Sequence, residues 1–222
     1  MAKASAKKIV SYFVLGCLGA AVSLILLVAL LQVIRAVFYE PYSIPSGAMI
    51  PTLLVGDHMY AAKWPYLGEE KPIKRGQVLL FKAPNIPSTI FVKRVIGLPG
   101  DKIEIKGFRV FVNDKELPRT ERPHYGDAEM DTLFDDHNVF EETLDGNTYS
   151  VMWKKEGKRV EEGTFEVPAG KLFFMGDNRS DAYDSRMYGN VDYSSVIGRA
   201  TYIFFSSSEA GFRMWRIGLQ VK

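Results

Sequence analysis

The chain has 222 residues, 47% of them hydrophobic and 24% charged, with a formal net charge of +2. This length allows one or two folded domains, and the small net charge without a long basic run argues against nucleic acid as a partner. The single cysteine, Cys17, excludes an internal disulfide and a cysteine-pair zinc site, and the histidines (His58, His124 and His137) lack ligand spacing, so we expect no metal and no cofactor.

An apolar run near the N-terminus is long enough to cross a bilayer. Residues 9–34 contain no charged side chain, and as a helix they would span about 39 Å. The apolar region of a cleavable signal peptide, the competing interpretation, is only about 7 to 15 residues long. We therefore expect residues 1–8 to form a cytoplasmic N-terminus and residues 9–34 to form an uncleaved transmembrane helix.

The charges that flank this run predict its orientation. Lys3, Lys7 and Lys8 precede it, and by the positive-inside rule they stay in the cytoplasm, although Arg35 on the other flank weakens the contrast. We expect a single-pass protein in contact with membrane lipid, with its C-terminal part outside the cytoplasm.

The rest of the chain is patterned as short strands. Segments rich in Val, Ile, Phe and Tyr are bounded by Gly, Pro, Asn or Asp, and they lie at 58–64, 76–84, 89–97, 101–107, 108–117, 163–177 and 197–205. This pattern predicts a mostly β domain with a core at 38–117 and 164–205. Within it, "VNDKEL" (112–117) is typical of a tight hairpin turn.

Two further segments are less regular. Residues 118–163 are more polar and carry acidic clusters until strand pattern returns at "NTYSVMWKKEG", so we expect an inserted β subdomain. The tail, 206–222, mixes aromatic and basic residues. It either lies at the membrane interface or is a last strand with a frayed end.

Lys93 is a candidate general base. It stands in the strand-like stretch "TIFVKRVIG", on the same face as Phe91 and Val95, since side chains alternate along a strand. Loss of hydration on an apolar face lowers the pKa of a lysine and makes its neutral form available near neutral pH. The strand pattern alone leaves open a lysine that reaches out to solvent.

Two other stretches could build a site around such a base. In "IPSGAMIPTL" (44–53), two prolines and a glycine form a rigid apolar turn that presents one small side chain, Ala48. In "MGDNRSDAYDSR" (175–186), acidic and arginine residues have a spacing that favours a hydrogen-bonded brace. A surface loop with local turns would explain the same residues.

In this order behind an N-terminal anchor, these stretches resemble bacterial type I signal peptidases, the membrane-bound serine endopeptidases that remove signal peptides from exported preproteins. The matching pieces are "PSGAMIPTLLVGD", "RGQVLLF", "FVKRVIGLPGD", "MGDNRSDAYDSR" and "IGRA". The resemblance implies a signal-peptidase-type β domain on the outer face of the bacterial plasma membrane. It also implies cleavage after small residues at the −1 and −3 positions of the substrate.

The resemblance assigns roles residue by residue. The nucleophilic serine of the family falls on Ala48, whose backbone amide would form the oxyanion hole together with the hydroxyl of Ser46. The general base falls on Lys93, and Asp184 and Arg186 match the residues that support it. The positions expected to bind substrate are Tyr42, Ile44, Pro45, Met49, Leu53, Phe91 and Val92.

Ala48 is the main departure from the family pattern, because alanine has no hydroxyl to attack a carbonyl. Ala182 is another, since many members have there a serine that hydrogen-bonds the lysine. We expect the chain to bind substrate without cutting it at a useful rate. The retained Ser46 and Lys93 favour a replaced serine over a natural loss, and a natural non-catalytic, membrane-anchored binding protein for exported chains is the alternative.

Overall fold

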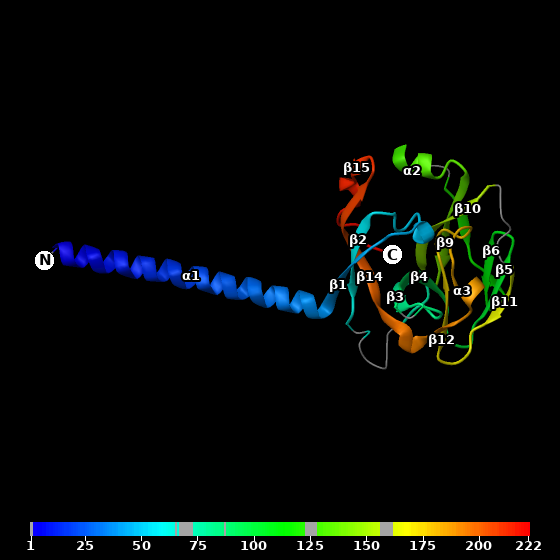
Figure 1. Ribbon diagram of the computed structural model, residues 1–222, viewed down its shortest axis with the longest axis horizontal. Helices are drawn as coiled ribbons and strands as arrows, with labels where there is room; N and C mark the ends of the chain where they lie inside the picture. The colour runs from blue at the N-terminus through cyan, green and yellow to red at the C-terminus, as the bar shows by residue number, and fades with distance from the viewer. Residues whose placement is uncertain (1, 65, 67–72, 87, 123–127, 156–161) are drawn as a thin grey trace. The chain divides into compact units, whose positions relative to one another are not determined.

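The computed structural model of the protein describes residues 2–64, 66, 73–86, 88–122, 128–155 and 162–222 (Figure 1). The chain divides into two compact units, Met1–Glu40 and Pro41–Lys222. His124, one of the histidines without ligand spacing, lies outside the described residues.

The first unit is a single long helix, α1 (Ala2–Phe38), which extends beyond residues 9–34 at both ends (Figure 1). Its stretch Val14–Phe38 has a mean hydropathy of 2.8 and is long and apolar enough to cross a bilayer. Leu24, Ile25 and Leu26 are each more than 60% exposed. Such a continuous apolar surface is unfavourable in water and suits a lipid environment.

The second unit is built mainly from strands, which confirms the mostly β fold predicted from the sequence. Within the described residues, its largest sheet has the order β1-β2-β14-β3-β4-β12-β13, and β15 pairs with β14. The strands of this sheet are β1 (Tyr39–Ser43), β2 (Asp57–Ala62), β3 (Val78–Lys82), β4 (Ile90–Gly97), β12 (Lys171–Met175), β13 (Val191–Asp192), β14 (Val196–Ser208) and β15 (Gly211–Phe212).

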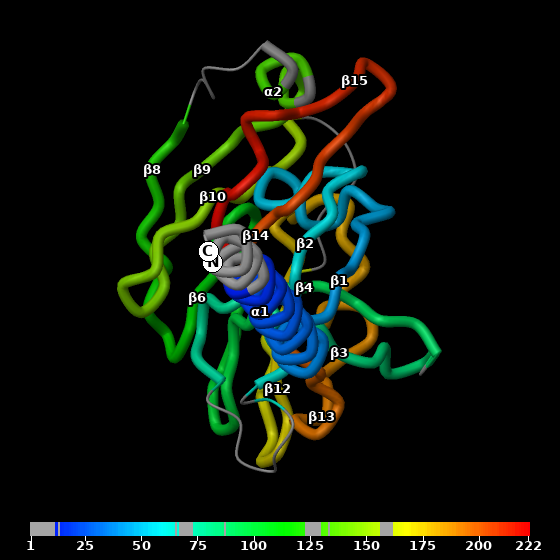
Figure 2. The backbone as a smooth tube through the Cα atoms, turned by 90° about the vertical axis from the view of Figure 1, so that its left-hand side faces the viewer, coloured from blue at the N-terminus to red at the C-terminus, as the bar shows by residue number. Residues whose placement is uncertain are grey.

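Two smaller sheets have the orders β11-β5-β6-β7 and β10-β9-β8. In Figure 2 the sheet of β8, β9 and β10 lies at the left of the unit, and β1, β2 and β3 lie at the right. The strands of the smaller sheets are β5 (Lys102–Lys106), β6 (Arg109–Val112), β7 (Lys115–Glu116), β8 (Arg119–Glu121), β9 (His137–Leu144), β10 (Asn147–Lys154) and β11 (Gly163–Glu166). The short helices are η1 (Gly47–Met49), α2 (Ala128–Leu133), α3 (Ser185–Tyr188), η2 (Tyr193–Ser195) and η3 (Met214–Arg216).

The hairpin predicted at 112–117 is present. β6 pairs with β7 so that Val112 lies opposite Lys115, which leaves Asn113 and Asp114 as a two-residue turn. Both turn residues have positive φ, 53° and 64°. A type I′ turn requires this conformation, and Asn and Asp adopt it more readily than most other residues.

The segment 118–163 contains more regular structure than its sequence pattern indicates, because β8, α2 and β9 precede β10. Its apolar side chains pack with residues of other segments. Val151 and Trp153 of β10 belong to one buried cluster with Ile103 of β5 and Phe173 of β12. The segment therefore shares its apolar core with the strands that flank it.

The C-terminal tail is held against the sheet. Arg216 forms a buried ion pair with Asp57 of β2, with Nη2 at 2.5 Å from Oδ2. Further along, the backbone N–H of Val221 donates to the carbonyl oxygen of Thr201 in β14 at 2.7 Å. The end of the chain is therefore tied to β14 and is not frayed in this structure.

Candidate functional site

The turn that carries Ala48 is anchored by apolar side chains. Ile44, Met49 and Leu53 are buried in one cluster with residues of β2 and β3, which fixes η1 against the sheet. Ala48 itself is only partly buried, and Ser46, just before η1, is exposed. The rigid platform predicted from the prolines and the glycine is thus built mainly by burial of its flanking apolar residues.

Lys93 is buried on β4. Only 5% of it is exposed, so the alternative of a lysine that reaches solvent is wrong. Its Nζ lies 5.3 Å from the centroid of the Phe91 ring and donates to the carbonyl oxygen of Val92 at 3.3 Å. The apolar surroundings predicted from strand alternation are therefore present.

Burial lowers the pKa of Lys93 from its ordinary value of 10.5 to about 8. The negative charges of Asp184 and Asp177 oppose this change, and the positive charge of Arg186 adds to it. A substantial fraction of the amine is therefore neutral at mildly alkaline pH, as a general base requires.

A cavity of about 520 Å³ brings the turn and the lysine together. Of the residues singled out in the sequence, its lining includes Tyr42, Ile44, Pro45, Ser46, Ala48, Met49, Phe91, Val92 and Lys93. Leu53 does not line it and lies in the apolar core instead. The lining also contains residues to which the sequence gave no place in the cavity: Ser43, Gly47, Thr89, Ile90, Asn178, Asp181 and Tyr183.

The loop after β12 is hydrogen-bonded to the turn that carries Ala48. The backbone N–H of Asn178 donates to the carbonyl oxygen of Ala48 at 3.2 Å, and its side-chain Nδ2 donates to that of Gly47 at 3.2 Å. Gly176 lies so close that a Cβ added to it would be 2.4 Å from the oxygen of Ala48 and 2.3 Å from the Cβ of Ala182. Only glycine fits at this position.

Asp184 and Arg186 brace this loop. The backbone N–H of Gly176 donates to Oδ2 of Asp184 at 2.9 Å, and Arg186 binds both oxygens of the same carboxylate at 2.7 Å. Arg186 also donates to the carbonyl oxygen of Arg179 at 2.6 Å. Neither side chain lines the cavity, and both fix the loop that contacts Ala48.

A second buried pair, which the sequence pattern did not predict, joins β4 to the same loop. Arg94, which is fully buried, donates from Nε to Oδ1 of Asp177 at 2.8 Å. The hydroxyl of Thr52 donates to the other oxygen of this carboxylate. The pair therefore links β4, the loop and the segment after η1. The arginine beside Lys93 was the available clue, but its partner lies far away in the sequence.

A third buried pair reaches the loop from the segment 118–163. Arg179 binds both carboxylate oxygens of Glu142 in β9, at 2.9 and 2.6 Å. The backbone of Met152 in β10 also accepts from the N–H of Arg179 and donates to the oxygen of Asp177, each at 2.9 Å. The segment 118–163 thus supports the loop that holds Ala48.

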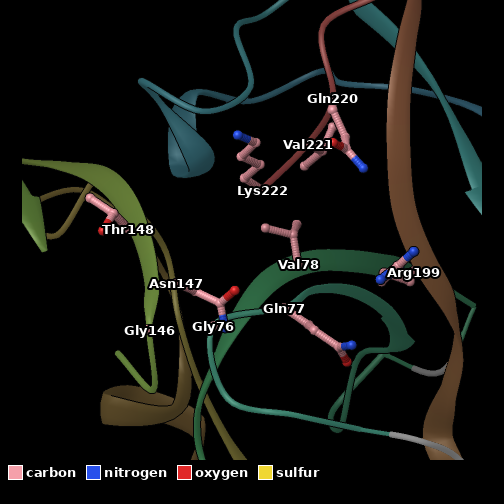
Figure 3. A pocket seen from close by; sticks show the side chains of 10 residues that line it. All are labelled: Gly76, Gln77, Val78, Gly146, Asn147, Thr148, Arg199, Gln220, Val221 and Lys222. Carbon is pink, nitrogen blue, oxygen red and sulfur yellow. The ribbon is translucent and has the colours of Figure 1, made fainter. Parts of the chain in front are cut away.

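Another cavity, of about 480 Å³, lies between the residues that lead into β3 and the C-terminal residues of the chain (Figure 3). The side chains of Gln77 and Arg199 border it, and the amine of Lys222 points away from them. The carbonyl oxygen of Lys222 accepts from Nη1 of Arg94 at 2.8 Å. This cavity contains none of the predicted catalytic residues.

Known proteins match this chain in sequence and, more weakly, in structure. The family described as "Signal peptidase, peptidase S26" matches residues 17–205. A signal peptidase I of Rickettsia typhi is 34% identical over 79% of this chain and 75% of its own length, and one of Rickettsia prowazekii is 33% identical over the same shares. A crystal structure of a signal peptidase I from Enterococcus faecalis aligns with 24% identity and a TM-score of 0.37 over 58% of this chain and 97% of that chain.

Proposed function

This chain belongs to the signal peptidase family, peptidase S26, and from that premise we propose that it binds the signal peptides of exported preproteins at the cavity beside Lys93 and lacks the nucleophile that cuts them. The observation that carries the proposal is the shared cavity. Ala48 and the buried Lys93 both line it, so a hydroxyl at residue 48 would meet a lysine whose neutral form is available.

With a serine at residue 48, the reaction follows from the lining. The hydroxyl attacks the scissile carbonyl carbon while its proton passes to the neutral amine of Lys93. The resulting oxyanion accepts hydrogen bonds from the backbone N–H of residue 48 and the hydroxyl of Ser46. Lys93 then protonates the leaving amine and later activates the water that hydrolyses the acyl-enzyme. Ala48 cannot begin this sequence.

Substrate binding rests on the apolar part of the lining. Ile44, Met49, Phe91 and Val92 surround the cavity beside Ala48, and such a surface accepts small apolar side chains. A preprotein segment binds there in extended form along the strand edges, with small residues at its −1 and −3 positions. A bulky residue at either position collides with the lining and is rejected.

The N-terminal helix determines on which side of the membrane the site lies. Helix α1 is the anchor, and the lysines before its apolar stretch keep the N-terminus in the cytoplasm and the β unit on the outer face. The tail adds an interfacial surface, because its apolar side chains are exposed. They include Phe212 at 68% and Met214 at 71%, together with Trp215, Ile217 and Leu219.

A natural non-catalytic binding protein is the rival function, and Ala48 is the observation that favours it. The buried Lys93 argues against it. Burial of an amine reduces stability wherever the amine is charged, and binding alone gains nothing from such a residue.

An experiment on substrate selection tests the proposal. The full chain in detergent should retain a preprotein with alanine at −1 uncut, and it should lose affinity when that alanine is changed to phenylalanine. The Ala48→Ser variant should cut the first preprotein at that bond and spare the second. Equal binding of both preproteins, or cleavage without regard to the −1 residue, contradicts the proposed site.

A further inference from the structure

Asn178 carries a buried hydrogen-bond acceptor that is not used within the described part of the chain. The residue is 5% exposed. Its Nδ2 donates to the carbonyl oxygen of Gly47, which identifies the two ends of the amide, since a carbonyl oxygen cannot be the donor of this bond. The other end, Oδ1, is buried without a hydrogen-bond partner among the described residues. A buried carbonyl in this state destabilises the fold, and a native structure that retains one calls for an explanation.

Lys93 has the complementary deficit. As an ammonium it carries three donor hydrogens, and its one hydrogen bond within the described residues is the long contact with the oxygen of Val92. Ala182 offers no hydroxyl and packs against Gly176. It stands at the position where many members of the family that this chain resembles have a serine that hydrogen-bonds the lysine. Lys93 thus has no side-chain acceptor among the described residues, and Asn178, whose Oδ1 is unused, lines the same cavity without a hydrogen bond to Lys93 in this structure.

The charged groups around Lys93 do not fill this role. The carboxylates that act on it are Asp184 and Asp177, and each is already held by an arginine in a buried pair. Arg186 acts on it only by repulsion, and Asp181, which also lines the cavity, is exposed and binds Lys154. The neutral amide of Asn178 therefore stands out as the free acceptor in the buried lining.

We propose that Oδ1 of Asn178 orients the amine of Lys93 toward residue 48, in place of the hydroxyl that is absent at residue 182. Asn178 is suited to this because two hydrogen bonds already tie it to the turn that carries Ala48. An amine held by Oδ1 is thereby placed relative to the nucleophile position. Asn178 is a positioning residue that acts through Lys93, and the inference rests on the proposed role of Lys93 as the base.

The first test needs no catalysis and uses the full chain in detergent with Ala48 retained. Competitive acetylation with acetic anhydride, followed by mass spectrometry, gives the pKa of Lys93 from the pH dependence of its labelling. Asn178→Asp should raise this pKa by about one unit or more, because it places a carboxylate at the acceptor. Asn190→Asp is the matched control. Asn190 also donates Nδ2 to a backbone oxygen, that of Glu166, and has a buried unused Oδ1, but it does not line the cavity. Equal pKa values in the two variants overturn the proposal.

The second test uses rescue in the Ala48→Ser background. Asn178→Ala should lower kcat by about 10- to 100-fold, the effect of losing one hydrogen bond to a charged group, with KM nearly unchanged. Ala182→Ser should then restore about tenfold of this loss, although alone it should change kcat little. If Ala182→Ser raises kcat no more in the Asn178→Ala background than it does with Asn178 retained, the proposal is overturned. If Ala48→Ser cuts nothing, the proposed function fails, and the labelling test still decides the role of Asn178.

Discussion

Lys93 shows how one buried side chain couples chemistry to stability. Its amine lies in apolar surroundings that lower its pKa to about 8. The same burial that makes the neutral amine available destabilises the fold wherever the amine is charged. Alternation along β4 predicted the apolar face. The extent to which Lys93 is buried was not predictable, because it depends on segments far away in the sequence, such as η1 and the loop after β12.

Activity should therefore depend on pH through Lys93. In the Ala48→Ser variant, kcat/KM should rise with pH through about 8 and level off above it, because only the neutral amine accepts the proton of the serine. Initial rates on a peptide substrate between about pH 6 and 10 measure this. A flat profile across that range contradicts the assignment of Lys93 as the base.

Stability should follow the same titration. The folded pKa of Lys93, about 8, lies below its ordinary value of 10.5, so between these values the unfolded chain binds more protons and the free energy of unfolding rises with pH. Below about pH 8 the amine is charged in both the folded and the unfolded chain, so burial of the charge lowers the free energy of unfolding by its full amount. Lys93→Met should therefore stabilise the protein at pH 7 and lose this advantage toward pH 10, as measured by urea unfolding. An advantage that stays constant with pH contradicts the buried amine.

At the scale of elements, three buried ion pairs fix the loop after β12. They join it to β4 through Arg94, to β9 through Glu142, and to α3 through Arg186. The sequence indicated a brace in this loop from its alternating charges. It could not supply Arg94 or Glu142, because neither is near its partner in the chain and each resembles an ordinary charged residue of a strand.

The strands of the segment 118–163 were likewise hard to predict, because their burial depends on distant partners. The helix α1 and the hairpin turn were predictable from local patterns, whereas β8 and β9 were not. In β9 (His137–Leu144) the buried positions are Val139, Glu142 and Leu144. A strand that buries a glutamate does not show the alternation of apolar and polar residues from which strands are recognised, since the reason for that glutamate is Arg179.

The pair formed by Glu142 should carry much of this loop's stability. Glu142→Gln leaves the buried Arg179 without its counter-charge and should cost about 3–5 kcal/mol. Glu141→Gln is the control and should cost about 0–1 kcal/mol, because Glu141 pairs with the half-exposed Arg122. Urea unfolding followed by tryptophan fluorescence, with Trp153 as a buried reporter, measures both. Similar losses in the two variants contradict the role given to β9.

At the scale of the whole molecule, function depends on which side of the membrane the β unit occupies. The apolar stretch Val14–Phe38 suits an anchor, and the lysines before it predict that the N-terminus stays inside. This prediction follows from the sequence alone and depends only on the charges at the two ends of the apolar run.

Cysteine labelling tests the orientation, since Cys17 is the only cysteine of the chain. In a Cys17→Ser background, Lys115→Cys, at an exposed position of β7, should react with a membrane-impermeant maleimide in intact bacterial spheroplasts. Lys3→Cys, its matched partner in the N-terminal segment, should react only after the membrane is opened. The reverse pattern contradicts the proposed topology and would place the cavity in the cytoplasm.

The hydroxyl missing at residue 48 is the proposed reason that this site does not cut peptide bonds. The most direct test of this role is to measure the rates at which the full chain and its Ala48→Ser variant cleave the same preprotein, with the new N-terminus identified by mass spectrometry. Ala48→Ser should cut after a small residue at least about 1,000-fold faster than the Ala48 chain, and adding Lys93→Met should abolish the gain. A folded Ala48→Ser variant that cuts no faster than the Ala48 chain, or cuts equally well without Lys93, contradicts it.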